Sequence, residues 1–209
     1  VDHVTEKNST RNVIRTPTNN KLRMEDKRGE QHIKISTEYG GKTQLNLGHN
    51  VDAERTLRGE GAELRTDDWV SIRGGKGILL SADRQPGAQG EMLDMEAAIL
   101  QLKQALSLAE SLSAAAGSAK ATPSEKDSQS QLNTALNELQ EAGILAYAPH
   151  GVGIVSPEAI RVASGEQSVG IVSGKNTDIS AAKSFTVAAK ETVSLFAQGE
   201  GMQLFSGNG

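Results

Sequence analysis

Residues 152–173 read VGIVSPEAIRVASGEQSVGIVS, and the same arrangement recurs every eight or nine residues from residue 144 to the end of the chain. In each unit, which we call an octad, two mostly apolar positions lie two residues apart and a small residue follows two positions later. This alternation predicts a β-strand with one buried face, because successive side chains of a strand point to opposite sides. Repetition at so short a period is typical of an elongated, stacked architecture rather than of a globular domain.

The apolar columns of the octads require a partner that buries them. A single-chain solenoid with three octads per rung would have fewer than three rungs, which is marginal for stability. Three identical chains that wind together would bury the columns and pair their backbones between chains. We therefore predict a mainly β fold, an intertwined trimeric triple-stranded β-helix with an inserted α-helical hairpin. The expected trimer core consists of Ile144, Val152, Ile154, Ile160, Val162, Val169, Ile171, Ile179, Phe185, Val187, Val193, Leu195, Met202 and Leu204.

The octad pattern also occurs upstream, at residues 62–66, 70–74 and 78–82. It stops at Asp83 and resumes at Ile144, so the intervening segment is interpreted as an insertion between two octads of one rod. The predicted organisation is N-terminal strands and loops at 1–57, first β-helix octads at 58–87, an inserted helical hairpin at 88–143 and a C-terminal β-helix needle at 144–209.

The insertion reads as two helices. Apolar residues spaced three and four apart give the first helix an apolar face, and Gly117 stands where a helix commonly ends. The segment TPSE at 122–125 has the spacing of an N-terminal cap for the second helix, which Gly143 would end. The second apolar stripe is short, so we expect the helix to pack on the first. The expected packing residues are Met92, Met95, Ile99, Leu102, Leu106, Leu132, Leu136 and Leu139.

The N-terminal region contains two further predicted strands. Residues 32–37 and 42–47 alternate in polarity, and Tyr39-Gly40-Gly41 forms the turn between them. Residues 1–20 show no period, and we expect them to be rich in loops.

The composition argues against several classes of function. The chain has no cysteine, so disulfides and thiolate chemistry are excluded. No apolar run approaches the ~20 residues that span a bilayer. A net charge of −4, without a basic patch interleaved with aromatic residues, argues against nucleic-acid binding.

Candidate catalytic and metal-binding groups are also poorly arranged. The four histidines show no pairing at metal-ligand spacing. Asp67 and Asp68 would point to opposite faces of a strand, which does not suit a general acid–base pair. The glycine-lysine segment at 73–77 lacks the Ser or Thr that a phosphate-binding loop places after its lysine. We therefore predict no enzymatic activity, no cofactor and no metal ion.

Several long runs resemble the C-terminal half of VgrG proteins, and with the octads the resemblance covers nearly the whole chain. These runs are RTPTNNKLRMED at 15–26, HIKI at 32–35, TEYG at 37–40, QLNLG at 44–48, RGEGAELRTDDW at 58–69 and GGKGILLSA at 74–82. VgrG proteins are the trimeric spikes of type VI secretion, similar to the central spike of contractile-tailed phages. The resemblance implies a homotrimeric needle that is carried on the Hcp tube, binds a PAAR-type tip protein and delivers effectors or adaptors.

The resemblance also implies a location and a transient partner. The spike would be present in the bacterial cytoplasm before assembly and would then be secreted into the exterior or a target cell, whose membrane it punctures. Two alternatives share parts of the pattern. A phage tail spike or tip would have the same needle, and a solenoid enzyme such as a polysaccharide lyase would need longer rungs and clustered charges on one face.

Overall fold

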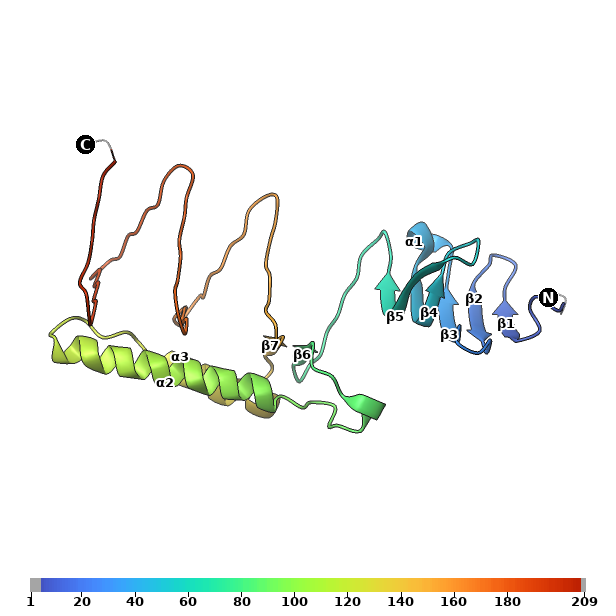
Figure 1. The fold of residues 1–209 in the computed structure, drawn as a ribbon, viewed down its shortest axis with the longest axis horizontal. Helices are drawn as coiled ribbons and strands as arrows, with labels where there is room; N and C mark the ends of the chain where they lie inside the picture. The colour runs from blue at the N-terminus through green and yellow to red at the C-terminus, as the bar shows by residue number, and fades with distance from the viewer. Residues whose placement is uncertain (1–4, 208–209) are drawn as a thin grey trace. The chain divides into compact units, whose positions relative to one another are not determined.

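The structure, a computed structural model, describes residues 5–207. Residues 1–4 and 208–209, the outer ends of the predicted N-terminal region and of the predicted needle, lie outside the described residues. The chain divides into two compact units, Val1–Ile72 and Arg73–Gly209, whose elements are shown in Figure 1. The chain is mainly β with few helices, and at this level the predicted fold class is confirmed.

The first unit is a five-stranded antiparallel sheet in which the strands pair in sequence order. Short connections are sufficient for this topology, because each antiparallel strand begins where its neighbour ends. The strands are β1 (Arg11–Arg15), β2 (Lys21–Glu25), β3 (His32–Ser36), β4 (Gln44–Val51) and β5 (Leu57–Arg65).

The turn between β3 and β4 lies where the sequence predicts it. The short helix α1 (Tyr39–Lys42) contains Gly40 and Gly41, each with a φ of 62°. Residues other than glycine rarely adopt this left-handed backbone conformation. A Cβ atom on Gly41 would also overlap the Asp67 side chain, so this turn requires glycine.

Two expectations for the first unit are wrong. The segment at 11–15 is not a loop but β1, which pairs with β2 from Arg11 opposite Glu25 to Arg15 opposite Lys21. Residues 62–65 are not an octad of the rod; they lie in β5, antiparallel to β4, with Leu64 opposite Leu45. The alternation could not distinguish the two arrangements, because every strand has a period of two.

The sheet has one polar and one apolar face, and the polar face is the buried one. The buried polar residues are Glu25, His32, Lys34, Ser36, Gln44, Asn46 and Asn50. The exposed large apolar residues are Ile14, Met24, Ile33, Ile35, Leu47 and Leu64. This is the reverse of the arrangement expected for a free-standing sheet in water.

The second unit pairs two short strands that are far apart in sequence. β6 (Ile78–Ser81) and β7 (Ile144–Tyr147) are parallel, with Ile78 opposite Ile144 and Leu80 opposite Ala146. These pairs join residues of the same octad column. The chain therefore leaves the octad pattern after β6 and resumes it in the neighbouring strand.

The segment between β6 and β7 is mostly helical. It contains the 3₁₀ helices η1 (Pro86–Ala88) and η2 (Asn137–Leu139) and the α-helices α2 (Glu96–Ser118) and α3 (Asp127–Leu136). α2 and α3 lie side by side (Figure 1), and the Asn133 side-chain amide donates a hydrogen bond to the Leu102 carbonyl oxygen at 3.1 Å.

A small apolar core joins the helices to β7. Met95, Ile99, Leu136 and Leu139 are buried together with Leu145 of β7. Of the other expected packing residues, Leu102 is partly buried against this core and Leu106 is half-buried. The structure leaves Met92 and Leu132 outside the core, with 87% and 49% of their surface exposed.

The helix ends differ from the predicted ones. α2 begins at Glu96, so Met92 precedes it, and Gly117 lies inside α2 instead of after it. α3 begins at Asp127, so the cap predicted from TPSE at 122–125 is wrong. The Glu125 carboxylate instead accepts hydrogen bonds from the backbone N–H groups of Asp127 and Ser128, at 2.7 and 3.1 Å. A negative charge is favoured there, because the N-terminus of a helix carries a partial positive charge.

After β7 the chain continues as an extended run. Residues 148–207 contain no helix or strand, and from 149 to 207 every residue except the half-buried Phe196 is exposed. Figure 1 shows this run passing back and forth without pairing with itself.

Candidate functional site, an assembly interface

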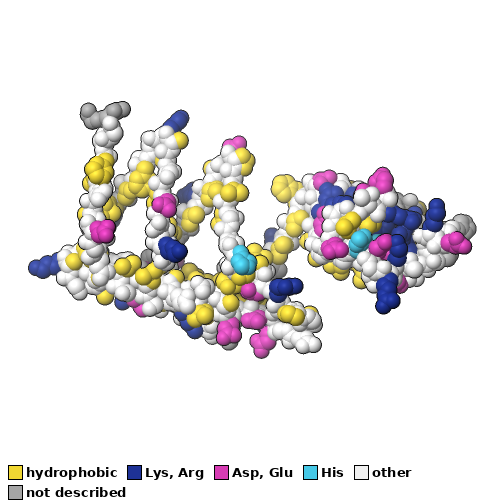
Figure 2. All heavy atoms as spheres, viewed as in Figure 1, with side chains coloured by type: hydrophobic (Ala, Val, Ile, Leu, Met, Phe, Trp, Pro, Cys, Tyr) yellow, Lys and Arg dark blue, Asp and Glu magenta, His cyan; other side chains and the backbone are white. Residues whose placement is uncertain are grey.

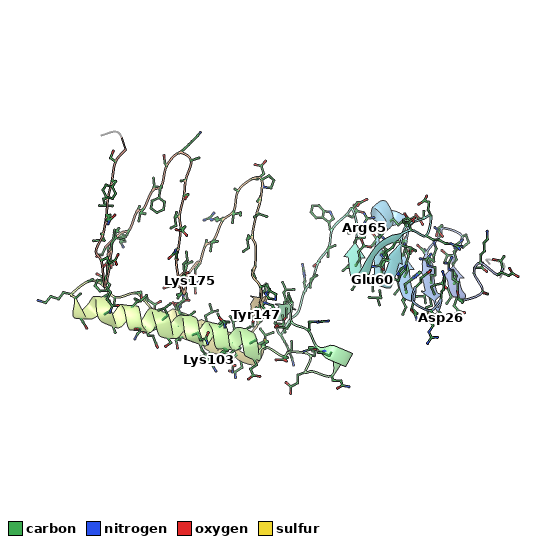
Figure 3. The ribbon with its side chains drawn as sticks, viewed as in Figure 1. Asp26, Glu60, Arg65, Lys103, Tyr147 and Lys175 are labelled. Atoms are coloured by element: carbon green, nitrogen blue, oxygen red, sulfur yellow. The ribbon has the colours of Figure 1, made fainter. Side chains whose placement is uncertain are left out.

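The residues of the expected trimer core are all exposed in the second unit. All fourteen are exposed over 52% to 93% of their surface. Figures 2 and 3 show such side chains along the extended run, with little packed against them. Burying one of them completely is worth about 1.5–3 kcal/mol. Exposed apolar side chains in such number are typical of a protein interaction surface.

The backbone of the extended run also lacks strand partners. Between residues 148 and 207 the one backbone–backbone hydrogen bond joins the Gly151 N–H to the Ala148 carbonyl oxygen, at 3.4 Å. Backbone amides in folded proteins are almost always paired. The run therefore presents both the apolar columns and the free N–H and C=O groups of an unpaired strand.

The face opposite the columns carries a few apolar side chains of its own. Val155 and Phe205 are exposed over 93% and 88% of their surface, and Val172 over 40%. Phe196 is half-buried.

The exposed apolar face of the first unit is a second surface of the same kind, and the trimer core predicted from the sequence did not include it. Its residues lie opposite one another across the strands, with Leu22 against Ile35 and Ile35 against Leu45. The alternation of residues 32–36 was the available signal. The sequence did not show which of the two faces of this sheet is buried.

The connection between α2 and α3 contacts the extended run at separate points. The Ser168 hydroxyl donates a hydrogen bond to the Glu125 carboxylate at 2.7 Å. The backbone N–H of Thr122 donates to the Ser194 hydroxyl at 3.2 Å. A groove between α3 and residues 164–168 is lined mainly by polar side chains.

The charge of Glu125 is strongly stabilised by these contacts. The Ser128 hydroxyl, then the Ser168 hydroxyl, then the Ser128 N–H lower the pKa of the Glu125 carboxyl to about 2. Glu125 is therefore ionised at neutral pH and acts as an acceptor for both the helix and the run.

No arrangement suited to metal binding accompanies this interface. Within residues 5–207 there is no group of three or more His, Cys, Asp or Glu side chains that could hold a metal ion. In the same part of the chain, no helix is both long enough and apolar enough to cross a membrane.

Comparison with known proteins identifies the family. The family model described as type VI secretion system Rhs element Vgr matches residues 11–116, half of the chain. A solved structure of the VgrG spike from the type VI secretion system is 66% identical, with a TM-score of 0.93, and the match covers 96% of this chain and 76% of that one. This chain belongs to the VgrG family.

Further matches agree with this assignment. A second solved VgrG spike, bound to the Tle1 effector, has the same identity and TM-score and is covered over 62% of its chain. A second family model, an uncharacterised protein family conserved in bacteria (DUF2345), matches residues 131–209. The spike proteins VgrG2b and VgrG2a of Pseudomonas aeruginosa are each 29% identical over an alignment of 196 residues, and each match covers 86% of this chain. This chain spans 19% and 23% of their lengths.

The resemblance to VgrG proteins that the sequence predicts is thus confirmed. The relatives are described as spike proteins, and the effector in the second solved structure, Tle1, is a protein distinct from the spike to which it is bound.

Proposed function

We propose that three copies of this chain wind together into the needle of a type VI secretion spike. The observation that carries this proposal is the extended run, in which the apolar columns are exposed and the backbone has no strand partner. Two neighbouring copies would supply the strand partners that the octads of the extended run lack, so that the columns close around a common axis. Layers about 4.7 Å apart would then carry eight octads roughly 38 Å along the rod.

The pairing of β6 with β7 supports this arrangement. It stacks two octads in parallel and places Ile78 on Ile144 in the same column. The small third column suits a crowded corner of a prism, where a larger side chain would collide with the neighbouring chain. In the first unit, the exposed apolar sheet face would form a trimer contact of its own.

The role that follows is mechanical. A rod stabilised by many layers of intermolecular strand pairing would transmit force when it is driven through a target-cell membrane, and it needs neither a cofactor nor a catalytic group. Its proposed partners are the Hcp tube behind it, a PAAR-type tip protein at its end, and effectors or adaptors. The solved VgrG spike with bound Tle1 supports the proposed effector contact. The protein would be present in the bacterial cytoplasm before assembly and would then be secreted into the exterior or a target cell.

The decisive experiment is a mass measurement of the purified chain in native buffer. Light scattering coupled to size exclusion should give about three times 22.1 kDa, independently of dilution in the micromolar range. Circular dichroism of the same peak should show β structure. A monodisperse monomer with an intact β signal would contradict both the trimer and the needle.

A further inference from the structure

The polar face of the first unit holds a cluster of basic side chains that the proposed needle does not use. Figure 2 shows Lys and Arg side chains gathered over this sheet. A hollow of about 450 Å³ is lined by eight of them, with Asp52 as the one acidic residue in the lining. The eight are Arg11, Lys21, Arg23, Lys34, Lys42, Arg55, Arg58 and Arg65.

Lys34 is the central residue of this hollow. It lies on the middle strand of the sheet, opposite Arg23 on β2 and Asn46 on β4. Only 8% of its surface is exposed, and within residues 5–207 it forms neither a hydrogen bond nor an ion pair. The Nε atom of Arg23 is also buried without a hydrogen-bond partner.

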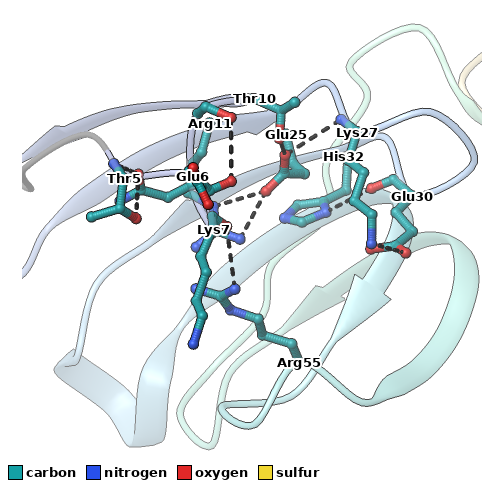
Figure 4. A network of polar contacts seen from close by, with 12 residues as sticks. Thr5, Glu6, Lys7, Thr10, Arg11, Glu25, Lys27, Glu30, His32 and Arg55 are labelled. Carbon is teal, nitrogen blue, oxygen red and sulfur yellow. Dashed lines mark hydrogen bonds and ion pairs between the residues drawn. The ribbon is translucent and has the colours of Figure 1, made fainter.

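The neighbouring acidic residues are already engaged by other basic residues of the same lining. Glu25 pairs with Arg11 at 2.8 Å and also accepts from Thr10 and from the backbone N–H of Lys27 (Figure 4). Glu63 pairs with Arg58 at 2.8 Å and accepts from the Asn46 amide at 2.7 Å.

Asp52, the one acidic residue of the lining, accepts a hydrogen bond from the backbone of the turn in which it lies. One of its carboxylate oxygens accepts from the Thr56 backbone N–H at 2.8 Å. These acids therefore leave the central positive charges uncompensated.

An unpaired charge on a largely buried side chain is unfavourable. Burial first, and then the charges of Lys42 and Arg23, lower the pKa of Lys34 to about 8. Most Lys34 side chains are still protonated at neutral pH, so the unfavourable free energy of this unpaired charge is present under ordinary conditions. An anion in the hollow would remove this cost, and guanidinium groups bind multivalent oxyanions with paired hydrogen bonds.

We propose that this hollow binds a phosphate-type oxyanion, with Lys34 and Arg23 as its central ligands. The ligand could be free inorganic phosphate or the phosphate of a lipid headgroup, which present the same chemistry. The hollow is lined by residues of one chain, so the proposal does not rest on the trimer, and either can fail without the other.

Calorimetry in phosphate-free buffer tests this site. Sodium phosphate titrated into the full chain should show saturable binding with one site per chain and should raise the melting temperature, as a ligand of the native state does. Lys34→Met keeps the length of the side chain and removes its charge. Loss of one charged hydrogen bond should weaken phosphate binding at least about tenfold.

The same variant has a second readout. Without phosphate, Lys34→Met should melt at the same temperature as the wild type or higher, because it removes an uncompensated buried charge. A merely structural lysine would instead lower the melting temperature in both buffers. Lys183→Met, on the exposed extended run, is the matched control and should leave phosphate binding unchanged.

Cosedimentation with phosphatidylglycerol or phosphatidylcholine vesicles distinguishes the two sources. If the chain binds the anionic phosphatidylglycerol vesicles and Lys34→Met abolishes this binding, the ligand is a lipid headgroup. If the chain binds phosphate but no vesicles, the ligand is the free ion. If Lys34→Met does not fold, Lys21→Met at the half-buried edge of the hollow replaces it. Absence of saturable phosphate binding and of Lys34-dependent vesicle binding, or an equal loss in Lys183→Met, overturns the proposal.

Discussion

The Glu125 carboxylate accepts a hydrogen bond from the Ser168 hydroxyl at 2.7 Å, across 43 residues of sequence. Glu125 lies just before α3, and Ser168 lies in the extended run. Together with the contact between Thr122 and Ser194, this bond holds the helical segment along the run. The helices are therefore placed to brace the rod in the proposed needle.

The Glu125 contacts predict a pH-dependent stability. The folded-state pKa of the Glu125 carboxyl, about 2, lies below its ordinary value of 4.5, chiefly because the Ser128 hydroxyl and then the Ser168 hydroxyl bond to the ionised form. The stabilisation is fully present above the unfolded pKa near 4.5 and is lost as the pH falls from there toward 2. Glu125→Gln should therefore melt below the wild type at pH 7, and the difference should shrink at pH 3. A difference that is unchanged between the two pH values would show that these bonds do not stabilise the fold.

Charges placed in the apolar columns should prevent assembly. Ile171→Asp or Val187→Asp would bury three unpaired carboxylates in one layer of the proposed trimer, which is strongly unfavourable. Size exclusion with light scattering should show loss of the trimer. The matched control is Thr186→Asp, one residue away on the opposite strand face, and Gly153→Asp is a second control. Loss of the trimer in the two controls but not in the column variants would mean that the inner and outer faces are the reverse of those proposed, and equal loss in both classes would mean that the columns are not specifically buried.

Two leucines of α3 should differ sharply in their contribution to stability. Leu136 is 7% exposed and belongs to the core that joins the helices to β7, whereas Leu132 is 49% exposed. Leu136→Ala should lower the free energy of unfolding by about 2–5 kcal/mol. Leu132→Ala should change it by about 0.5 kcal/mol or less. Denaturant unfolding of both variants measures this, and a similar cost for each would mean that another surface covers Leu132 in the assembled protein.

Removal of residues 88–143 should leave a trimer. The strand pairing of β6 with β7 does not require the helices, but parallel strands need a crossover connection of about a dozen residues. A Gly/Ser linker of that length should therefore replace the insertion. The melting temperature should fall, because Leu145 loses its cover from Met95 and Leu136. Light scattering gives the mass and circular dichroism the β signal, and a monomeric product would place the helices in the assembly core.

The local sequence pattern was sufficient to predict several elements, and the elements that it did not predict share a common cause. The turn at Gly40 and Gly41 and the apolar face of α2 could be predicted, because each depends on residues a few positions apart. β1 could not, because its hydrogen bonds come from β2 and its own sequence has little alternation. The start of α3 was misplaced for a similar reason: Glu125, not Thr122, accepts the first N–H groups of the helix.

The sequence by itself determined the octad columns, the interruption between residues 83 and 144 and the resemblance to VgrG proteins, because a strand's alternation and a repeat's period are properties of neighbouring residues. Only the tertiary structure decided that Ile78 lies on Ile144, that the polar face of the first sheet is the buried one and that Glu125 reaches Ser168. Each of these depends on which distant segment supplies the hydrogen bond or the covering surface, and no local period records that choice.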